Sequence, residues 1–182
     1  MGMVTKQTVP SPETLDRLAS ELAQRAREIR RQLHQYPETC YEEQKTAAMI
    51  REELSRLGIP FEAGVTDAPT ATIGHIGEPS LPCVALRADI DGLPILEQND
   101  LPYKSRHPGR MHACGHDGHM ASLLGAAAVL KRLESDRQLP VCVKLIFQPA
   151  EEGGGGAKRI VNAGALDGRI GPKAQCIFGL HG

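Results

Sequence analysis

Three histidines and one cysteine lie within eight residues of one another, in the stretch from His112 to His119. In an extended segment, Cys114 and His116 are two positions apart and point to the same side of the chain. A thiolate and an imidazole are ligands that zinc and other borderline divalent metals accept. Gly115 lies between them and leaves room for close approach. The cluster taken alone is equally consistent with a metal site and with a solvated loop around a buried cysteine.

The same cysteine is also a candidate nucleophile. Asp117 is a candidate cap for a helix that begins there, and the partial positive charge at a helix start lowers the pKa of a nearby thiol. A thiolate at Cys114, paired with His112 or His116, would resemble the activated pair of a thiol hydrolase. The cluster taken alone leaves both chemistries open.

Two adjacent carboxylates, Glu151 and Glu152, follow shortly after an apolar run that ends at Phe147. Like charges so close together repel unless a cation or a shared proton compensates. A catalytic metal site uses such a pair, one carboxylate as a ligand and the other as the general base that takes a proton from water. Which glutamate has which role is left open by the residues. A solvated acidic turn is the ordinary alternative. A thiol mechanism has no use for the pair, which therefore favours the metal site over a thiol hydrolase.

Two smaller groups follow other apolar runs. Asp89 and Asp91 share one face of a strand, where they could add a ligand or orient a ligating imidazole, or else cap a turn. His181 follows the last apolar run, and taken alone such a histidine is usually a surface residue. The remaining histidines are interpreted as structural or loop residues: His34, His75 and His107.

These groups lie where predicted elements end or begin. Apolar spacing predicts helices over residues 11–36, 42–57, 117–133 and 157–163, strands over 70–76, 83–90, 141–147 and 174–180, and a frayed tail over 1–12. Strands that alternate with helices indicate an α/β fold with a mostly parallel central sheet flanked by helices. Ligands in such folds bind beyond the carboxyl ends of the strands, so we expect the four groups to converge on one rim.

Length and charge narrow the class of protein. A chain of 182 residues is sufficient for one domain. Its 21 basic and 22 acidic residues give a net charge of −1, with no basic excess for nucleic acid. No run approaches the roughly 18 apolar residues of a membrane span, and the first residues lack the apolar core of a secretory signal. We expect a soluble cytoplasmic protein with free thiols and no nucleic-acid or membrane partner.

Four segments, in this order, closely resemble the M20 metallopeptidase family: LRADIDGLPI, MHACGHDGHMASLLGAAAVL, LIFQPAEEGGGGAKRIVNAGAL and FGLHG. The nearest branch is the amidohydrolases, which include hippurate hydrolase, N-acyl-amino-acid amidohydrolase and the auxin-conjugate hydrolases. The resemblance runs from about Leu15 to the last residue. It implies a zinc-exopeptidase-like fold with two divalent ions, of zinc, manganese, cobalt or nickel. It also implies hydrolysis of the amide bond of small N-acylated amino acids.

The resemblance also assigns roles, residue by residue. It implies four metal ligands, with Glu151 as the general acid and base and Asp91 as the carboxylate that orients the site. The ligands are Cys114, His116, Glu152 and His181.

Members of this family are about twice as long as this chain. By comparison, residues 1–182 are the N-terminal part of the catalytic domain, without the lid and dimerisation domain and without one further ligand histidine. We then expect an unpaired sheet edge with exposed apolar surface, which favours association, including a homo-oligomer. Three functions stay open: a metal-dependent amidohydrolase, a non-catalytic metal-binding or association-prone half-domain, and a thiol hydrolase that depends on Cys114.

Overall fold

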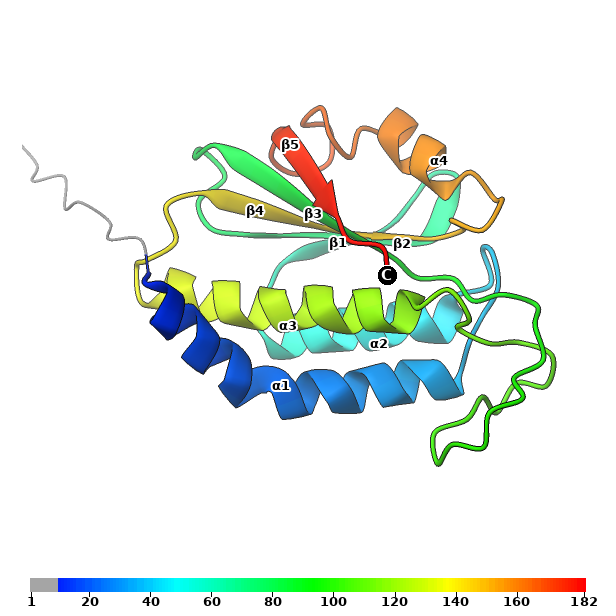
Figure 1. Ribbon diagram of the computed structural model, residues 1–182. Helices are drawn as coiled ribbons and strands as arrows, with labels where there is room; N and C mark the ends of the chain where they lie inside the picture. The colour runs from blue at the N-terminus through cyan, green and yellow to red at the C-terminus, as the bar shows by residue number, and fades with distance from the viewer. Residues whose placement is uncertain (1–9) are drawn as a thin grey trace, which may run out of the picture.

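The computed structural model describes residues 10–182, so residues 1–9 of the expected tail lie outside the described part (Figure 1). Every predicted helix and strand is present, with bounds within two residues of those expected. The helices are α1 (Pro12–Gln35), α2 (Gln44–Arg56), α3 (His116–Ser135) and α4 (Gly156–Ala163). The strands are β1 (Phe61–Val65), β2 (Ala68–Ile76), β3 (Cys83–Asp89), β4 (Cys142–Gln148) and β5 (Ala174–Gly179).

The five strands form one sheet in the order β1-β2-β4-β3-β5. Strand β3 pairs in parallel with β4 and β5, whereas β1 with β2 and β2 with β4 are antiparallel. The α/β class is confirmed, and the sheet is mixed. Strand β1 was not expected from the sequence, and two residues join it to β2, a connection short enough only for an antiparallel hairpin.

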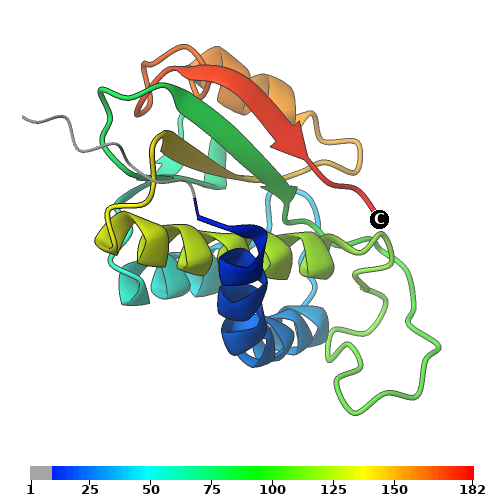
Figure 2. The ribbon, with the colours of Figure 1, turned by 60° about the vertical axis from the view of Figure 1, so that its left-hand side comes forward.

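The helices cover the two faces of the sheet unequally. Figures 1 and 2 show α1, α2 and α3 on one face and α4 on the other. Each face buries its own apolar cluster. The larger cluster, under α1 to α3, includes Leu33, Ile50, Leu54, Met120, Leu124, Leu145 and Phe147, and the smaller one, under α4, includes Ile73, Ala85, Ile146, Ile160 and Ala165.

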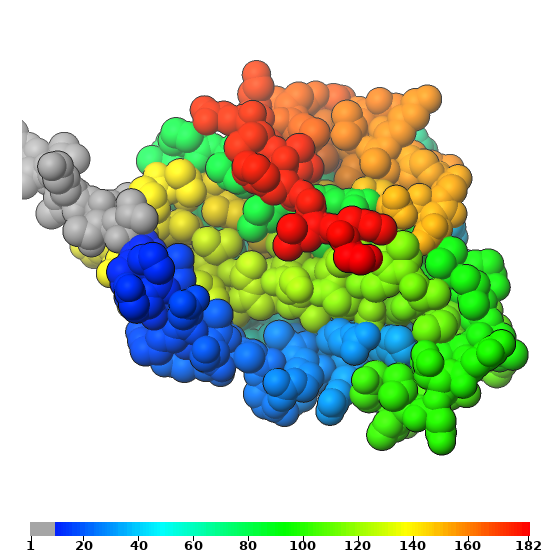
Figure 3. All heavy atoms as spheres, in the orientation of Figure 1, coloured from blue at the N-terminus to red at the C-terminus, as the bar shows by residue number. Residues whose placement is uncertain are grey.

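Strand β5 forms one edge of the sheet, as expected from the resemblance. Its side of the molecule exposes three large apolar side chains: Ile177 (46%), Phe178 (62%) and Leu180 (79%). In Figure 3 this C-terminal segment, in red, lies across the surface above α3. None of the described helices combines the length and apolar character needed to cross a membrane.

The parallel strands decide where the polar groups meet. Strands β3, β4 and β5 run in the same direction, so their carboxyl ends lie at one rim, and α3 begins at this rim (Figure 2). The last residues of the chain reach the first turn of α3, where the Gly182 N–H donates to His119 Nε2 (3.1 Å). The sheet therefore brings together side chains from four separate stretches of sequence.

The larger apolar cluster should carry much of the stability of this fold. Phe147 on β4 is fully buried, so Phe147→Ala should lower the free energy of unfolding by about 3 to 5 kcal/mol, measured by denaturant titration. Phe178→Ala on exposed β5 is the matched control and should change it by no more than about 0.5 kcal/mol. Similar losses in the two variants would contradict the assignment of the core.

Candidate metal centre

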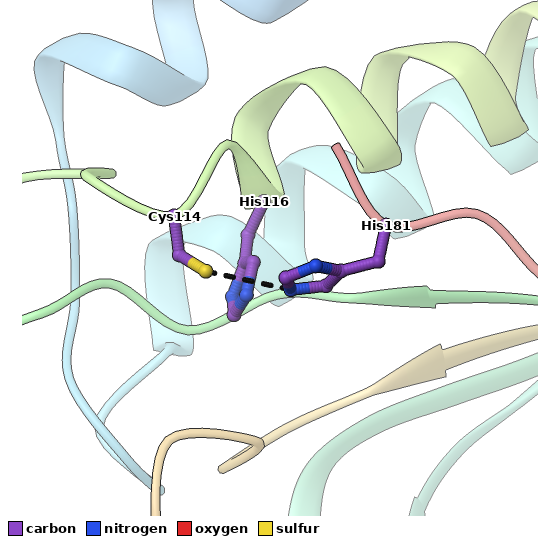
Figure 4. Close-up of side chains that lie close together, drawn as sticks. All are labelled: Cys114, His116 and His181. Atoms are coloured by element: carbon purple, nitrogen blue, oxygen red, sulfur yellow. Dashed lines mark hydrogen bonds between the residues drawn. The ribbon is translucent and has the colours of Figure 1, made fainter.

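Cys114, His116 and His181 come together at the rim. Their potential ligand atoms all lie within 4.8 Å of one another, and Cys114 Sγ is 3.4 Å from His181 Nε2 (Figure 4). Gly115 separates the first two in a left-handed conformation (φ 77°) that glycine adopts without strain, and there it begins α3 as its N-cap. A thiolate and an imidazole on one tetrahedral zinc ion would lie about 3.6 Å apart. The observed spacing fits a shared cation.

The two glutamates approach the same imidazole from the loop after β4. His116 Nε2 lies 3.7 Å from Glu151 Oε2 and 3.8 Å from Glu152 Oε1. His116 is the first residue of α3, and its side chain is only 1% exposed. The convergence of the four polar groups on one rim is therefore confirmed, with His116 at its centre.

Asp91 determines the orientation of His116. His116 Nδ1 lies 2.8 Å from the backbone carbonyl oxygen of Asp91, which can only accept a hydrogen bond. One proton therefore resides on Nδ1, and in the neutral imidazole the lone pair of Nε2 faces the two glutamates. The carboxylate of Asp91 accepts the backbone N–H of Glu152 (3.0 Å). Asp91 thus contacts two of the residues that the resemblance assigns as ligands.

Several buried atoms of the site have no hydrogen-bond partner among the described residues. They include His116 Nε2, Glu152 Oε1 and Asp91 Oδ1. A buried polar atom without a partner is costly, and native structures rarely leave one unexplained. Nitrogen and oxygen lone pairs that face one another within ligand distance would be satisfied by a cation. The residues present therefore fit a divalent metal.

The environment of Cys114 differs from the sequence expectation. Burial first, and then the carboxylates of Glu152, Glu151 and Asp89, raise the pKa of the Cys114 thiol. The expected lowering by the helix start is outweighed, because the surrounding negative charge disfavours a thiolate. A thiol nucleophile needs the opposite environment, whereas a bound cation deprotonates a coordinating thiol directly.

Asp117 does not cap α3, which is a second difference. Its carboxylate instead faces α1, 2.8 Å from His34 Nδ1 and 2.8 Å from Arg30 Nε. His34 Nε2 lies 3.1 Å from Glu97, and the hydrogen bond to Asp117 outweighs burial and raises the pKa of His34. His34 thus links α1, the first turn of α3 and the preceding loop, which agrees with a structural role. Of the other two histidines, His75 lies in β2 and His107 in the loop before α3.

His119 was not selected from the sequence, although it belongs to this group. Its Nδ1 lies 2.6 Å from Asp89 Oδ1, and Asp89, His116 and His119 form a further group with ligand atoms within 4.8 Å. The available signal was its spacing, since residues three apart on a helix share a face. Asp89 also accepts from Arg87 Nη1 (2.7 Å), so its charge is compensated within the protein.

Comparison with known proteins identifies relatives of this chain. The sequence model of the peptidase family M20/M25/M40 matches residues 85–182. An IAA-amino acid hydrolase (ILR1-like 4) of Arabidopsis thaliana is 48% identical over 153 residues, which are 84% of this chain and 33% of the relative. The N-acetyl-L-cysteine deacetylase of Bacillus subtilis strain 168 is 49% identical over 154 residues, which are 84% of this chain and 35% of the relative.

Solved structures show the same fold. The YXEP protein of Bacillus subtilis, described as a dinuclear metal binding peptidase from the M20 family, superposes with a TM-score of 0.79 at 41% identity, over 89% of this chain and 43% of that one. A putative aminohydrolase from methicillin-resistant Staphylococcus aureus gives 0.83 at 34% identity, over 94% and 42%. The chain spans about a third of the length of the two curated relatives, the IAA-amino acid hydrolase and the N-acetyl-L-cysteine deacetylase. Because the family model matches more than half of the chain, including all the residues of the site, this chain belongs to the peptidase family M20/M25/M40.

Proposed function

We propose that this chain provides the metal centre for hydrolysis of the amide bond of small N-acylated amino acids. One observation carries the proposal. The unpartnered Nε2 of buried His116 faces a thiol, a second imidazole and two carboxylates at ligand spacing. The names of two relatives, an IAA-amino acid hydrolase and an N-acetyl-L-cysteine deacetylase, support N-acyl amino acids as the substrate class.

Four residues would hold the metal: Cys114, His116, Glu152 and His181. The two groups that share His116 together offer five ligand atoms, more than the four that one tetrahedral ion binds, which supports a pair of ions. The description of the Bacillus subtilis YXEP protein as dinuclear supports the same number. A mixed set of thiolate, imidazole and carboxylate accepts zinc, manganese, cobalt or nickel.

The two glutamates differ in how far they reach outward. The side chain of Glu152 is 25% exposed with one oxygen buried and unpartnered, whereas that of Glu151 is 34% exposed. The chemistry that two bound divalent ions supply is a lowered water pKa and a polarised amide carbonyl. Glu151 then takes a proton from the attacking water and passes it to the amine nitrogen as the C–N bond breaks. Asp91 keeps the free lone pair of His116 directed into the site.

Composition and thiol chemistry support the setting of this reaction. The net charge of −1 supports a small-molecule substrate over nucleic acid. All five cysteines are free thiols, which supports a reducing compartment such as the cytoplasm. The exposed apolar side chains along β5 favour a second candidate function, association through this edge of the sheet.

The first test is metal content in protein purified without chelator. We expect two ions per chain, and loss of metal with at least about tenfold weaker affinity in Cys114→Ser, because a serine hydroxyl stays protonated where a thiol ionises. Elemental analysis gives the stoichiometry. Cys176→Ser makes the same change on exposed β5 and should keep the metal. Equal metal loss in both variants, or none in either, would contradict the assignment of Cys114.

A second test distinguishes the roles of Glu151 and Glu152. Glu151→Gln should retain metal and lose about 10² to 10⁴ in turnover of an N-acyl amino acid such as hippurate, because the proton carrier is gone. Glu152→Gln should lose metal, because a neutral amide is a poorer ligand than a carboxylate. Metal content and initial rates are measured on the same preparations. Loss of metal in Glu151→Gln with retention in Glu152→Gln would show that the roles are exchanged.

Chelation distinguishes the metal mechanism from the thiol mechanism. Removal of metal should abolish hydrolysis and readdition of zinc or manganese should restore it, because the centre supplies the lowered water pKa. Alkylation of the metal-loaded protein should leave the rate unchanged, since Cys114 is then occupied. If activity survives the chelator and disappears on alkylation, Cys114 is a nucleophile and the metal proposal is wrong.

A further inference from the structure

The connection between α1 and α2, residues 36–43, contacts the loop that carries Glu151 and Glu152. Ala150 N–H donates to Glu43 Oε1 (3.0 Å), and the Tyr41 hydroxyl donates to the carbonyl of Gly154 (2.6 Å). A third, weaker contact joins Cys40 Sγ to the carbonyl of Glu152 (3.5 Å). Three contacts thus hold residues 150–154 from one side.

Glu43 is the most buried member of this connection. Glu43 has no solvent-exposed surface. Its second carboxylate oxygen accepts a hydrogen bond from Thr70 Oγ1 (2.7 Å). Neither the Thr70 hydroxyl nor the Ala150 N–H is a cation. A carboxylate buried without a cationic partner is costly, so its position calls for an explanation in the groups that it contacts.

The backbone that Glu43 contacts is strained. Ala150 has a φ of 52° and Tyr41 one of 61°, a left-handed conformation that residues with a side chain rarely adopt. Among the described residues only Arg137 shares this property outside glycine. Two of the three strained residues therefore lie in the contact between residues 36–43 and the loop, and such strain persists only where surrounding contacts enforce it.

The strained residue immediately precedes the two glutamates. A left-handed turn at Ala150 redirects the chain as it leaves β4, and it places Glu151 and Glu152 within 3.7 and 3.8 Å of His116 Nε2. Ala150 is fully buried, so without Glu43 its N–H would be left without a partner in the interior. Relaxation of Ala150 to the right-handed region would then move both carboxylates away from the imidazole.

We propose that Glu43 is a positioning residue, which holds Ala150 in its left-handed conformation and thereby directs Glu151 and Glu152 to the metal centre. Tyr41 supports the same loop four residues further on, through Gly154. The role in the metal centre rests on the proposed function, whereas the hold on the loop does not. Neither Glu43 nor Tyr41 contacts the potential ligand atoms directly.

Three variants separate positioning from general stability. Glu43→Leu removes the acceptor for Ala150 N–H. Glu43→Gln keeps it, because the amide oxygen can accept from Ala150 while the amide nitrogen donates to the Thr70 hydroxyl. Thr70→Val removes only the other hydrogen bond of Glu43 and is the matched control for loosening of the surrounding packing.

Hydrogen exchange and cobalt binding are the two measurements. In Glu43→Leu we expect the amides of residues 150–154 to exchange at least tenfold faster than in the wild-type protein, with the amides of α3 unchanged. We also expect at least tenfold weaker Co²⁺ binding and an altered visible Co²⁺ spectrum. Glu43→Gln should stay within twofold of wild type in both measurements. A requirement for charge would impair Glu43→Gln, and a requirement for bulk alone would leave Glu43→Leu unimpaired.

Each result decides the proposal. It is wrong if Glu43→Leu exchanges and binds Co²⁺ like Thr70→Val, or if Glu43→Gln is as impaired as Glu43→Leu. Should Glu43→Leu fail to fold by circular dichroism, Glu43→Met, which also lacks an oxygen acceptor, is used, and unchanged exchange at residues 150–154 in that variant contradicts the proposal. If the wild-type protein binds no Co²⁺ while exchange still separates the variants, the proposed function fails and the hold of Glu43 on the loop stands.

Discussion

The hydrogen bond from His116 Nδ1 to the backbone carbonyl of Asp91 is the constraint on which the rest of the site depends. It assigns the ring proton to one nitrogen and leaves the other free, aimed at two carboxylates and without a partner. The bond exists because β3 ends two residues before Asp91 at the point where α3 begins. If α3 began at a different position relative to the end of β3, either Nδ1 or neither ring nitrogen of His116 would face the glutamates.

Charge is distributed unevenly around that bond. Asp89 is balanced by Arg87, and the Asp91 carboxylate accepts the backbone N–H of Glu152. Among the described residues the side chains of Glu151 and Glu152 have no arginine or lysine partner. Burial, and then these two carboxylates, raise the pKa of Cys114. The protein therefore balances the charge of Asp89 with an arginine and hydrogen-bonds the carboxylate of Asp91, whereas the two glutamates keep a charge that a cation would bind. This division explains why a thiol, two imidazoles and two carboxylates lie together at one rim.

The contacts that hold the site come from α1 and from the connection between α1 and α2. On one side, His34 of α1 binds Asp117 in the first turn of α3 and so fixes the helix that presents His116. On the other, Glu43 contacts Ala150 just before the two glutamates. The exposed strand β5 leads to His181, two residues beyond its end, and has the least support, since its outer edge is unpaired among the described residues. The site is thus firmly anchored at α3 and β4 and less so at β5.

The sequence by itself determined the elements and the four groups of polar residues at their ends, because both depend on spacing along a few turns or strands. It also assigned the family, through four long motifs. Only the tertiary structure decided the mixed strand directions, the pairing of His34 with Asp117 and the contact of Glu43 with Ala150. The last two pairs are 83 and 107 residues apart, and no local pattern marks a buried acidic residue as the partner of a distant backbone N–H. Such contacts arise from packing, which brings together groups that have no periodic relation in the chain.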